Sequence, residues 1–318
     1  MTRSNPLSRW LVLLAASCLL APSAAPAETK PQVDLPVTIE HALGTTVIDS
    51  RPDRVVALDM NELDFLDRLG VPVIGTAKDF VPHFLAKYRD DPAVADIGMI
   101  VQPNVEKVHA LHPDLILMTS LQAAHYPEMS SFAPVIHYDV DYRDSSSGHI
   151  QVVGDHFLTL ARIFGKEDLA KAEIAALEDK ITTLRSLTEG RPERALLVLH
   201  NNGGFSAFGM KSRYGFVFDA FGVKAANEAT ETGLHGQPVT SEFIQATNPD
   251  IIYVIDRTAV MEHRPVLDAA TIENPLLRET TAWKAGKVIF VDPEAWYTTA
   301  ASITPLEIII DDIRKGYE

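Results

Sequence analysis

Cysteine is almost absent from this sequence, since Cys18 is the only one among 318 residues. It lies inside an N-terminal segment with the pattern of a removable signal, so the rest of the chain carries no thiol. This excludes a disulfide framework and thiolate-bound iron–sulfur or soft-metal sites from the rest of the chain. A metal held there must take oxygen or nitrogen ligands.

Long apolar runs are also missing after the first twenty residues. Residues 10–20 are apolar but shorter than the roughly 20 residues that span a membrane. Arg3 and Arg9 precede this run, and Ala25-Pro26-Ala27 follows it as a small-residue cleavage site. We therefore predict that residues 1–27 are a signal peptide and that the protein is exported to the periplasm.

One alternative concerns Cys18 itself. Ala15-Ala16-Ser17-Cys18 loosely resembles a lipoprotein processing site, at which the cysteine would be lipidated. The usual leucine three residues before the cysteine is missing, and apolar Leu19-Leu20 follows. Cleavage after Ala27 is therefore the prediction, and lipid anchoring through Cys18 is its alternative.

Positive charge is scarce. The chain has 28 Lys and Arg against 43 Asp and Glu, which gives a formal net charge of −15. Loss of the two arginines of the signal would make the remainder more acidic still. Such a balance argues against nucleic acid and anionic membrane surfaces as partners. An anionic ligand would have to be met by cations gathered at one place.

The common hydrolase motifs are missing as well. The segment 204–208 reads Gly-Phe-Ser-Ala-Phe and fails the last position of the Gly-x-Ser-x-Gly elbow. No His-Glu-x-x-His zinc motif occurs either. We therefore predict that the protein is not an enzyme, with a secreted hydrolase kept as an alternative.

Short apolar strands alternate with short helical segments on both sides of a long helical stretch. This pattern predicts an α/β fold of two Rossmann-like lobes with parallel sheets, residues 28–148 and 191–318. Residues 149–190 are nearly continuous in helical pattern, with an interruption at Gly165, and contain no flexible linker. We expect them to form a stiff helical spine between the lobes; two ordinary surface helices are the alternative.

One unit occurs twice in the chain. Residues 106–114 and 242–250 both begin with Glu, both end with Pro-Asp, and both precede an apolar strand. The repeat suggests two lobes of similar construction. A Pro-Asp pair also occurs often in the turn before a buried strand of an α/β fold, which is the simpler explanation of the repeat.

The second copy of the unit lies within a longer segment, residues 233–257. Two glycines flank His235 on a loop, Thr240 or Ser241 can cap a short helix, and residues 251–255 form an apolar strand. This strand delivers Arg257 to its carboxyl end, the edge at which open α/β sheets bind ligands. A histidine and an arginine are therefore expected at one site.

Four side chains should converge at this edge: Arg213, His235, Arg257 and Tyr297. A tyrosine phenolate is a hard oxygen ligand that suits Fe³⁺, and an imidazole can complete an iron site. The planar guanidinium groups suit anionic oxygen ligands. Taken singly, each residue has an ordinary explanation, such as a solvated loop histidine or a packed tyrosine.

The order and spacing of several motifs carry a resemblance across residues 195–300. These motifs are Ser212-Arg213-Tyr214-Gly215, Leu234-His235-Gly236, Thr240-Ser241-Glu242-Phe243-Ile244, Asn248-Pro249-Asp250, Asp256-Arg257, and Asp292-Pro293-Glu294 through Trp296-Tyr297. The chain resembles the periplasmic ferric-siderophore-binding proteins of ABC importers, the class III binding proteins with two lobes joined by a rigid helix. It is most similar to the catecholate branch, which includes the enterobactin-product binder of Campylobacter and petrobactin-binding proteins.

The resemblance implies how a ligand would be held. His235 and Tyr297 would bind the iron of a tetradentate siderophore, filling the two positions that such a ligand leaves open. Arg213 and Arg257 would neutralise the catecholate oxygens. Fe³⁺ would arrive as part of the siderophore complex, with no intrinsic cofactor.

The resemblance also implies a partner. Glu106 and Glu242, one on each lobe, would dock onto arginines of an inner-membrane ABC permease that works with its ATPase. The binding protein itself is expected to be a monomer.

One departure affects ligand choice. Where the family usually has an arginine, this chain reads Ser120-Leu121-Gln122, so Leu121 removes a cation from the N-terminal side of the site. Lys78 could partly replace it. A haem, corrinoid or hydroxamate binder on the same fold stays an alternative, although His235 with Tyr297 argues against hydroxamates, which fill the iron shell themselves.

Overall fold

The computed structural model describes residues 1–2, 35–227 and 233–318. The predicted signal peptide from residue 3 onward, its cleavage site and Cys18 lie outside the described residues. Val33–Glu318 form one compact unit. Among the helices that are described, none is long and apolar enough to cross a membrane.

The described chain opens with the predicted hairpin, in which β1 (Val37–His41) pairs with β2 (Gly44–Ile48) in antiparallel register. A five-stranded sheet follows, with the order β5-β4-β3-β8-β9 and every pairing parallel. Its strands are β3 (Val55–Ala57), β4 (Val73–Thr76), β5 (Ala95–Asp96), β8 (Leu115–Thr119) and β9 (Val135–Tyr138). When the five strands are numbered by their order in the chain, the sheet has the order 3-2-1-4-5. This is the order of a Rossmann-like half, as predicted.

Short helices and two short antiparallel strands connect these strands. They are α1 (Met60–Arg68), η1 (Lys78–Phe80), η2 (His83–Leu85), α2 (Ala86–Asp90), β6 (Gly98–Met99), β7 (Gln102–Pro103), α3 (Val105–Ala110), η3 (Ser120–His125) and α4 (Tyr126–Met129). The central strands β3 and β8 are buried along their whole length, because helices cover both faces of the sheet.

The predicted helical stretch is two helices, α5 (His149–Phe164) and α6 (Glu167–Thr188). Gly165 takes a left-handed conformation with φ of 65°, which ends α5 and turns the chain. A Cβ added at Gly154 would lie 3.8 Å from the side chain of Ile174, so the two helices run back along each other. The expectation of one nearly continuous spine is therefore wrong, because the turn at Gly165 reverses the direction.

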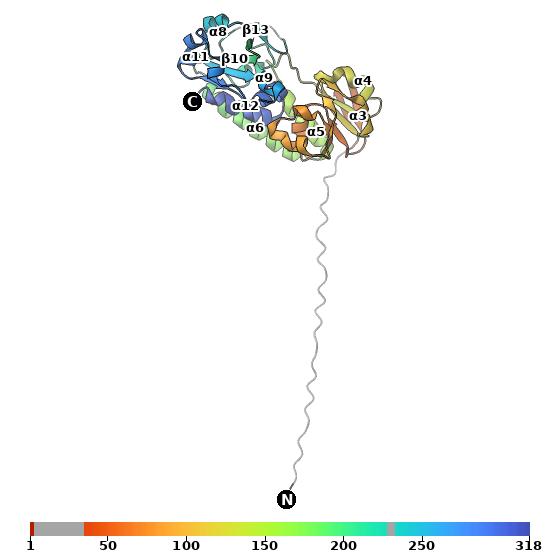
Figure 1. Ribbon diagram of the computed structural model, residues 1–318. Helices are drawn as coiled ribbons and strands as arrows, with labels where there is room; N and C mark the ends of the chain where they lie inside the picture. Colours follow the sequence, from red (N-terminus) through yellow and green to blue (C-terminus); the bar gives the residue numbers. More distant parts are fainter. Residues whose placement is uncertain (3–34, 228–232) are drawn as a thin grey trace. The chain divides into compact units, whose positions relative to one another are not determined.

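α6 makes contacts toward both ends of the molecule. Near its start, Glu173 pairs with Arg68 of α1 at 2.7 Å, and near its end Arg185 donates to the carbonyl of Asp219 at 2.8 Å. The C-terminal helix α12 (Ile303–Lys315) lies beside α6, as Figure 1 shows, and Glu307 of α12 pairs with Lys180 of α6 at 2.6 Å. The boundaries predicted for the lobes stay a prediction.

The second sheet has the order β13-β11-β10-β14-β15, with β12 beside β10. The pairings among β10, β12, β14 and β15 are parallel. β11 pairs antiparallel with β10, and β13 pairs antiparallel with β11. The strands are β10 (Arg194–Asn201), β11 (Gly204–Phe208), β12 (Lys224–Ala225), β13 (Gln237–Val239), β14 (Ile251–Asp256) and β15 (Val288–Phe290). The remaining elements are α7 (Gly215–Asp219), α8 (Ser241–Thr247), α9 (Arg257–Glu262), α10 (Ala269–Ile272), η4 (Leu277–Glu279), α11 (Thr281–Lys284) and η5 (Glu294–Thr299).

The repeated Pro-Asp unit has the same structural role in both sheets. The carboxylate of Asp114 accepts hydrogen bonds from the backbone N–H groups of Asp53 and Arg54 at 2.9 and 2.7 Å, at the start of β3. Asp250 accepts in the same way from the N–H of Arg194 at 2.8 Å, at the start of β10. Each aspartate thus ties the beginning of its own strand to the beginning of the central neighbour.

The helix before each aspartate ends in the same way. His112 and Asn248 take left-handed φ values of 48° and 44°, and their carbonyls accept from the guanidinium groups of Arg54 and Arg194. These contacts fix where α3 and α8 end, at the amino edges of the sheets. The opposite ends of α3 and α8 therefore lie toward the carboxyl edges, where ligands bind in such sheets.

Candidate functional site

The structure brings all four predicted side chains, Arg213, His235, Arg257 and Tyr297, to one cavity of about 240 Å³. Arg257 is the first residue of α9, directly after β14, and Tyr297 lies in the π-helix η5. Arg213 precedes α7, and His235 precedes β13. Leu121 lines the same cavity from the side of the first sheet, as expected.

Lys78 does not take the place that was predicted for it. Its Nζ donates to the carbonyl of Asp91 at 2.6 Å, and Lys78 is not among the residues that line the cavity. The suggestion that it replaces a cation at Leu121 is therefore wrong, because its ammonium group is used to hold a neighbouring turn.

Tyr297 lies at the centre of the cluster. Its hydroxyl accepts a hydrogen bond from Nε of Arg257 at 2.7 Å, and its carbonyl accepts one from Nη2 of Arg213 at 3.0 Å. The guanidinium carbons of Arg257 and Arg213 lie 5.4 and 5.6 Å from the centre of its ring. The ring of His235 stacks on it at 6.0 Å with an interplanar angle of 23°. The phenol oxygen is therefore oriented and surrounded by positive charge.

The two arginines face the cavity without acidic partners. Arg213 is only 7% exposed, and its guanidinium carbon lies 5.8 and 5.1 Å from the rings of Tyr142 and Tyr214. Arg257 donates to the side-chain oxygen of Asn201 at 3.1 Å. Within residues 35–227 and 233–318, neither guanidinium forms an ion pair. Two partly buried positive charges that lack a counterion attract an anion.

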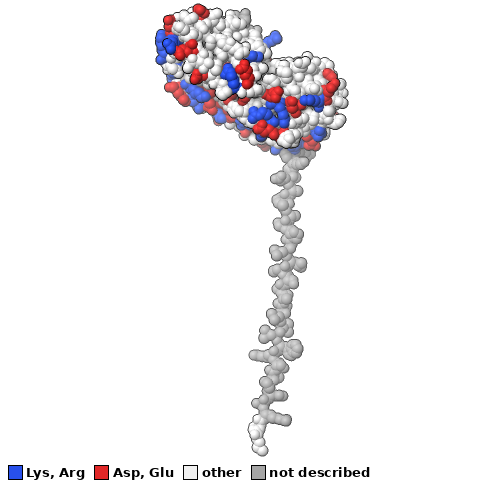
Figure 2. All heavy atoms as spheres, in the orientation of Figure 1, with Lys and Arg blue, Asp and Glu red and all other residues white. Residues whose placement is uncertain are grey.

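This concentration of charge is local. On the face drawn in Figure 2, Lys and Arg are mixed with Asp and Glu in small groups. The lining of the cavity differs from that face, because it contains two arginines and no carboxylate, as expected for an acidic protein with an anionic ligand.

His235 lies at the rim of the cavity. Burial of its ring, together with the charges of Arg257 and Arg213, lowers its pKa from the usual 6.5. The imidazole is therefore neutral at neutral pH and keeps a lone pair that can bind a metal. A histidine and a tyrosine offer only two ligands, so Fe³⁺ bound here would have to bring its other ligands with it.

Apolar side chains form the rest of the lining. Met99, Val101 and Met261 line the cavity although they are 49%, 57% and 40% exposed, and Phe80 joins them. Exposed large apolar residues grouped at a cavity mark a surface that a ligand covers. Methionines adapt to irregular shapes and contact aromatic rings favourably. The cavity therefore suits a ligand that combines anionic oxygens with an apolar or aromatic surface.

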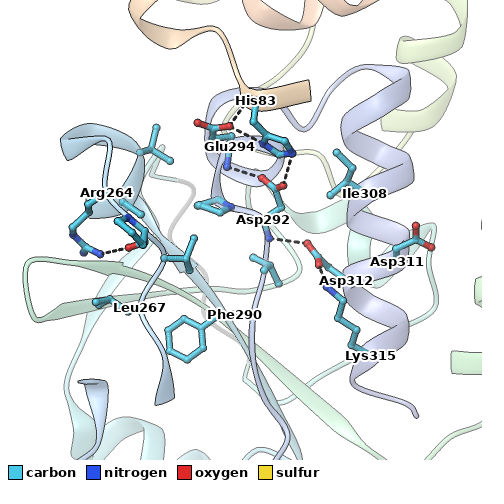
Figure 3. A pocket seen from close by; sticks show the side chains of 16 residues that line it. His83, Arg264, Leu267, Phe290, Asp292, Glu294, Ile308, Asp311, Asp312 and Lys315 are labelled. Atoms are coloured by element: carbon cyan, nitrogen blue, oxygen red, sulfur yellow. Dashed lines mark hydrogen bonds and ion pairs between the residues drawn. The ribbon is translucent and has the colours of Figure 1, made fainter. Parts of the chain in front are cut away.

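The π-helix that carries Tyr297 is fixed at both ends. At its start, the carboxylate of Glu294 accepts from the backbone N–H of His83 at 2.6 Å and contacts the His83 ring at 2.8 Å (Figure 3). Just after its end, Ala300 takes a left-handed φ of 71°, and its carbonyl accepts from Nε2 of His149 at 2.9 Å. π-Helical turns occur often at functional sites. Here the turn sets the direction of the Tyr297 side chain.

Figure 3 also shows another cavity, of about 600 Å³, beside this turn. His83, Asp292 and Glu294 contribute to its wall, but none of the four predicted residues does. Size alone therefore does not identify the ligand site, whereas the grouping of chemically suited side chains does.

The sequence analysis missed several residues of the site. Tyr142 follows the carboxyl end of β9, and Asn201 is the last residue of β10. The rule that identified Arg257, that ligand-binding residues follow parallel strands, would have found both. Phe80 and Met99 lie in a loop-rich region without a pattern, and no sequence signal marks them.

Glu106 and Glu242 lie in the first turns of α3 and α8, which are capped by Asn104 and Thr240. Both glutamates are exposed, and in the described part of the chain neither forms an ion pair. A backbone hydrogen bond and one to Thr240 lower the pKa of Glu242. Both side chains therefore stay available to a partner.

Comparison with known proteins identifies relatives along nearly the whole chain. The family described as periplasmic binding protein matches residues 55–295. The ferric-anguibactin-binding protein FatB of Vibrio anguillarum is 56% identical over 297 residues, which cover 93% of this chain and 92% of FatB. The petrobactin-binding protein YclQ of Bacillus subtilis is 35% identical over 290 residues, covering 89% and 88%.

Solved structures agree with these matches. The siderophore-binding protein BauB, bound to a complex between two molecules of acinetobactin and ferric iron, has a TM-score of 0.86 and 58% sequence identity, covering 89% of this chain and 99% of BauB. The crystal structure of YclQ has a TM-score of 0.82. The predicted class III binding-protein fold is confirmed.

Proposed function

Because the chain belongs to the periplasmic binding protein family, we propose that it binds a ferric siderophore and delivers it to the permease of an ABC importer for iron uptake. Relatives with 56% and 58% identity bind ferric anguibactin and a ferric complex of acinetobactin, according to their names. The observation that carries the proposal is Tyr297, held between two arginines without counterions and stacked on a neutral imidazole.

In this proposal the four side chains have two different roles. His235 and Tyr297 bind Fe³⁺ when the siderophore leaves two positions open, and the iron is cargo rather than a resident cofactor. Arg213 and Arg257 neutralise the anionic oxygens of the chelate, to which charge-assisted hydrogen bonds contribute about 1.5–3 kcal/mol each. No chemical step is required of the protein, which acts as a transport component and not as an enzyme.

We propose catecholates as the ligand class, since their oxygens are hard and anionic and their rings match the apolar rim formed by Met99, Val101 and Met261.

For localisation, we propose export with cleavage after Ala27, on the basis of the small-residue site at 25–27. N-terminal sequencing of the exported protein should begin at Glu28. A lipid-modified Cys18 at the N-terminus would instead establish the lipoprotein alternative.

The iron-binding role is tested with two ferric catecholates that differ in the number of oxygens they supply, one tetradentate and one hexadentate. Tyr297→Phe and His235→Ala should each weaken binding of the tetradentate complex by roughly tenfold or more. A tenfold loss corresponds to about 1.4 kcal/mol of binding free energy. Binding of the hexadentate complex should change much less. The visible charge-transfer band should also shift in Tyr297→Phe, since a phenolate leaves the iron.

Tyr126→Phe is a matched control, because Tyr126 does not line this cavity. It should leave both affinities and the band unchanged. Equal losses for the two complexes in the site variants would assign His235 and Tyr297 to packing and overturn iron binding by the protein.

A further inference from the structure

A second cavity opens beside the proposed ligand site. It has a volume of about 440 Å³ and shares Leu121, Tyr142 and Leu234 with the lining of the first cavity. The shared residues make the two cavities neighbours along one wall. A ligand seated against Arg213 and Arg257 can therefore extend an arm past Leu121 into this side cavity.

The side cavity differs from the first in the sign of its charge. Asp139 and Asp141 line it, together with Arg143. In residues 35–227 and 233–318, neither aspartate is paired with a lysine or arginine, and Oδ1 of Asp139 lies 2.5 Å from Nδ1 of His137. The first cavity has two arginines in its lining and no carboxylate. The joined space is therefore positive at one end and carries an excess of carboxylate at the other.

A buried hydrogen-bonding atom lies in the same place. His137 lines the side cavity and is 6% exposed, with Nδ1 facing Asp139. Its Nε2 is fully buried and has no hydrogen-bond partner among the described residues. With the proton on Nδ1, toward the carboxylate, Nε2 is an acceptor. A buried acceptor without a donor is costly, so a ligand arm that brings an N–H group within reach of Nε2 would be favoured here.

The surrounding contacts hold the acceptors in position. Both oxygens of Asp139 accept from the backbone N–H of Ala42, at 3.2 and 3.1 Å. Asp141 accepts from the N–H of Arg143 at 2.7 Å with one oxygen, Oδ1. His41, the neighbour of His137, is used elsewhere: its Nε2 bonds Thr46 at 3.1 Å. The carboxylates are thus preorganised, and the other oxygen of Asp141 can accept from a ligand.

We propose that the side cavity is a subsite for a cationic hydrogen-bond donor, a protonated amine on an arm of the ferric complex. This rests on the proposed function and specifies its ligand: the complex is zwitterionic, with anionic chelating oxygens against Arg213 and Arg257 and a basic nitrogen beside Asp139 and Asp141. The subsite thus selects among ferric siderophores by the charge of the arm.

Three catechols with matched side chains test the subsite: dopamine, 4-propylcatechol and 3-(3,4-dihydroxyphenyl)propionate. Their side chains end in an ammonium, a methyl and a carboxylate group. Each is mixed with Fe³⁺ at two catechols per iron and titrated against the purified protein, with tryptophan fluorescence as the readout. We expect the dopamine complex to bind about tenfold more tightly than the propylcatechol complex, and the carboxylate complex to bind most weakly.

Variants assign this preference to the side cavity. In Asp139→Asn/Asp141→Asn, and partly in Asp141→Asn alone, the preference for dopamine should fall to about twofold or less, because asparagine keeps the backbone contacts and loses the charge. Arg143→Gln should increase the preference by removing a like charge. Asp168→Asn, whose side chain is fully exposed on α6, is the matched control and should retain the parent ratio.

Two results would overturn the subsite: equal binding of the dopamine and propylcatechol complexes by the parent, or a preference that survives in the folded Asp141→Asn and double variants. Failure of all three complexes to bind would overturn the proposed function, and the subsite with it. Thermal unfolding of each variant establishes that it is folded.

Discussion

The contact between Arg257 and Tyr297 sets the chemistry of the site at the scale of single residues. Arg257 uses Nε for the tyrosine hydroxyl and Nη1 for Asn201, so one planar group orients two partners. Arg213 reaches the carbonyl of Tyr297 while its face lies near the ring of Tyr214. Both arrangements depend on the shape of the guanidinium group as well as on its charge.

Replacement of either arginine by lysine separates shape from charge. Arg257→Lys and Arg213→Lys should each weaken binding of a ferric catecholate by about tenfold, because an ammonium cannot hold two partners in fixed directions. Fluorescence titration measures the change. Arg278→Lys, at an exposed ion pair with Glu273, is the control. Affinities equal to that of the parent would reduce the two arginines to a general positive field.

At the scale of elements, three segments meet beside Tyr297. The π-helix η5 ends at Thr299, α12 begins at Ile303, and the first residue of α5, His149, donates a hydrogen bond to the Ala300 carbonyl. The His149 ring stacks on Phe216 of α7 at 4.5 Å. The start of α5 thus fixes the turn that positions the tyrosine.

This junction should be sensitive to acid. Burial lowers the pKa of His149 to about 4, against 6.5 for an exposed histidine. Between these values the unfolded chain takes up a proton that the folded protein excludes, so the stabilisation present above pH 6.5 is lost as the pH falls toward 4. The loss amounts to at most roughly 3 kcal/mol of unfolding free energy.

His149→Gln keeps a hydrogen-bond donor for the Ala300 carbonyl but does not titrate. Chemical denaturation between pH 4 and pH 7 should therefore give a flatter dependence on pH for this variant than for the parent. Identical slopes for the two proteins would show that His149 does not contribute to acid sensitivity. The difference between the slopes is the quantity measured, since other groups titrate in both proteins.

At the scale of the whole molecule, the chain builds two sheets by the same local rules. Asp114 and Asp250 fix equivalent strand starts, and α3 and α8 present Glu106 and Glu242 from equivalent first turns. A helix N-terminus favours an acidic residue by about 0.3–1 kcal/mol, which would explain each glutamate by itself. Two exposed carboxylates at equivalent positions also suit a transporter with two similar halves.

We expect Glu106→Ala and Glu242→Ala to leave siderophore affinity and thermal stability nearly unchanged. The double variant should abolish ligand-dependent stimulation of the importer's ATPase in reconstituted membranes, since both carboxylates that we propose to dock on the permease are removed. Glu178→Ala/Glu189→Ala, on and just after α6, controls for loss of acidic charge. Normal stimulation by the folded Glu106/Glu242 double variant would return both glutamates to a role in helix capping.

Local sequence patterns were sufficient to predict much of the fold and part of the candidate site. Period, caps and turn residues identified the hairpin 37–48, the main parallel strands and the ligand edge, because each depends on neighbours in sequence. Arg257 and Tyr297 were predicted at this edge because they follow parallel strands, whereas Arg213 and His235 lie on loops and were indicated by the motifs that contain them. The repeated Pro-Asp unit was also visible in the sequence.

Other features depend on packing between distant segments. The reversal at Gly165 follows from α5 and α6 packing on each other, and Lys78 is drawn to a turn carbonyl that no pattern marks. The side cavity joins Ala42, Asp139 and Leu234, which are far apart in the chain. The sequence determined which local elements form and which residues follow them. Only the tertiary structure decided which side chains share a cavity, because that depends on how buried faces pack together.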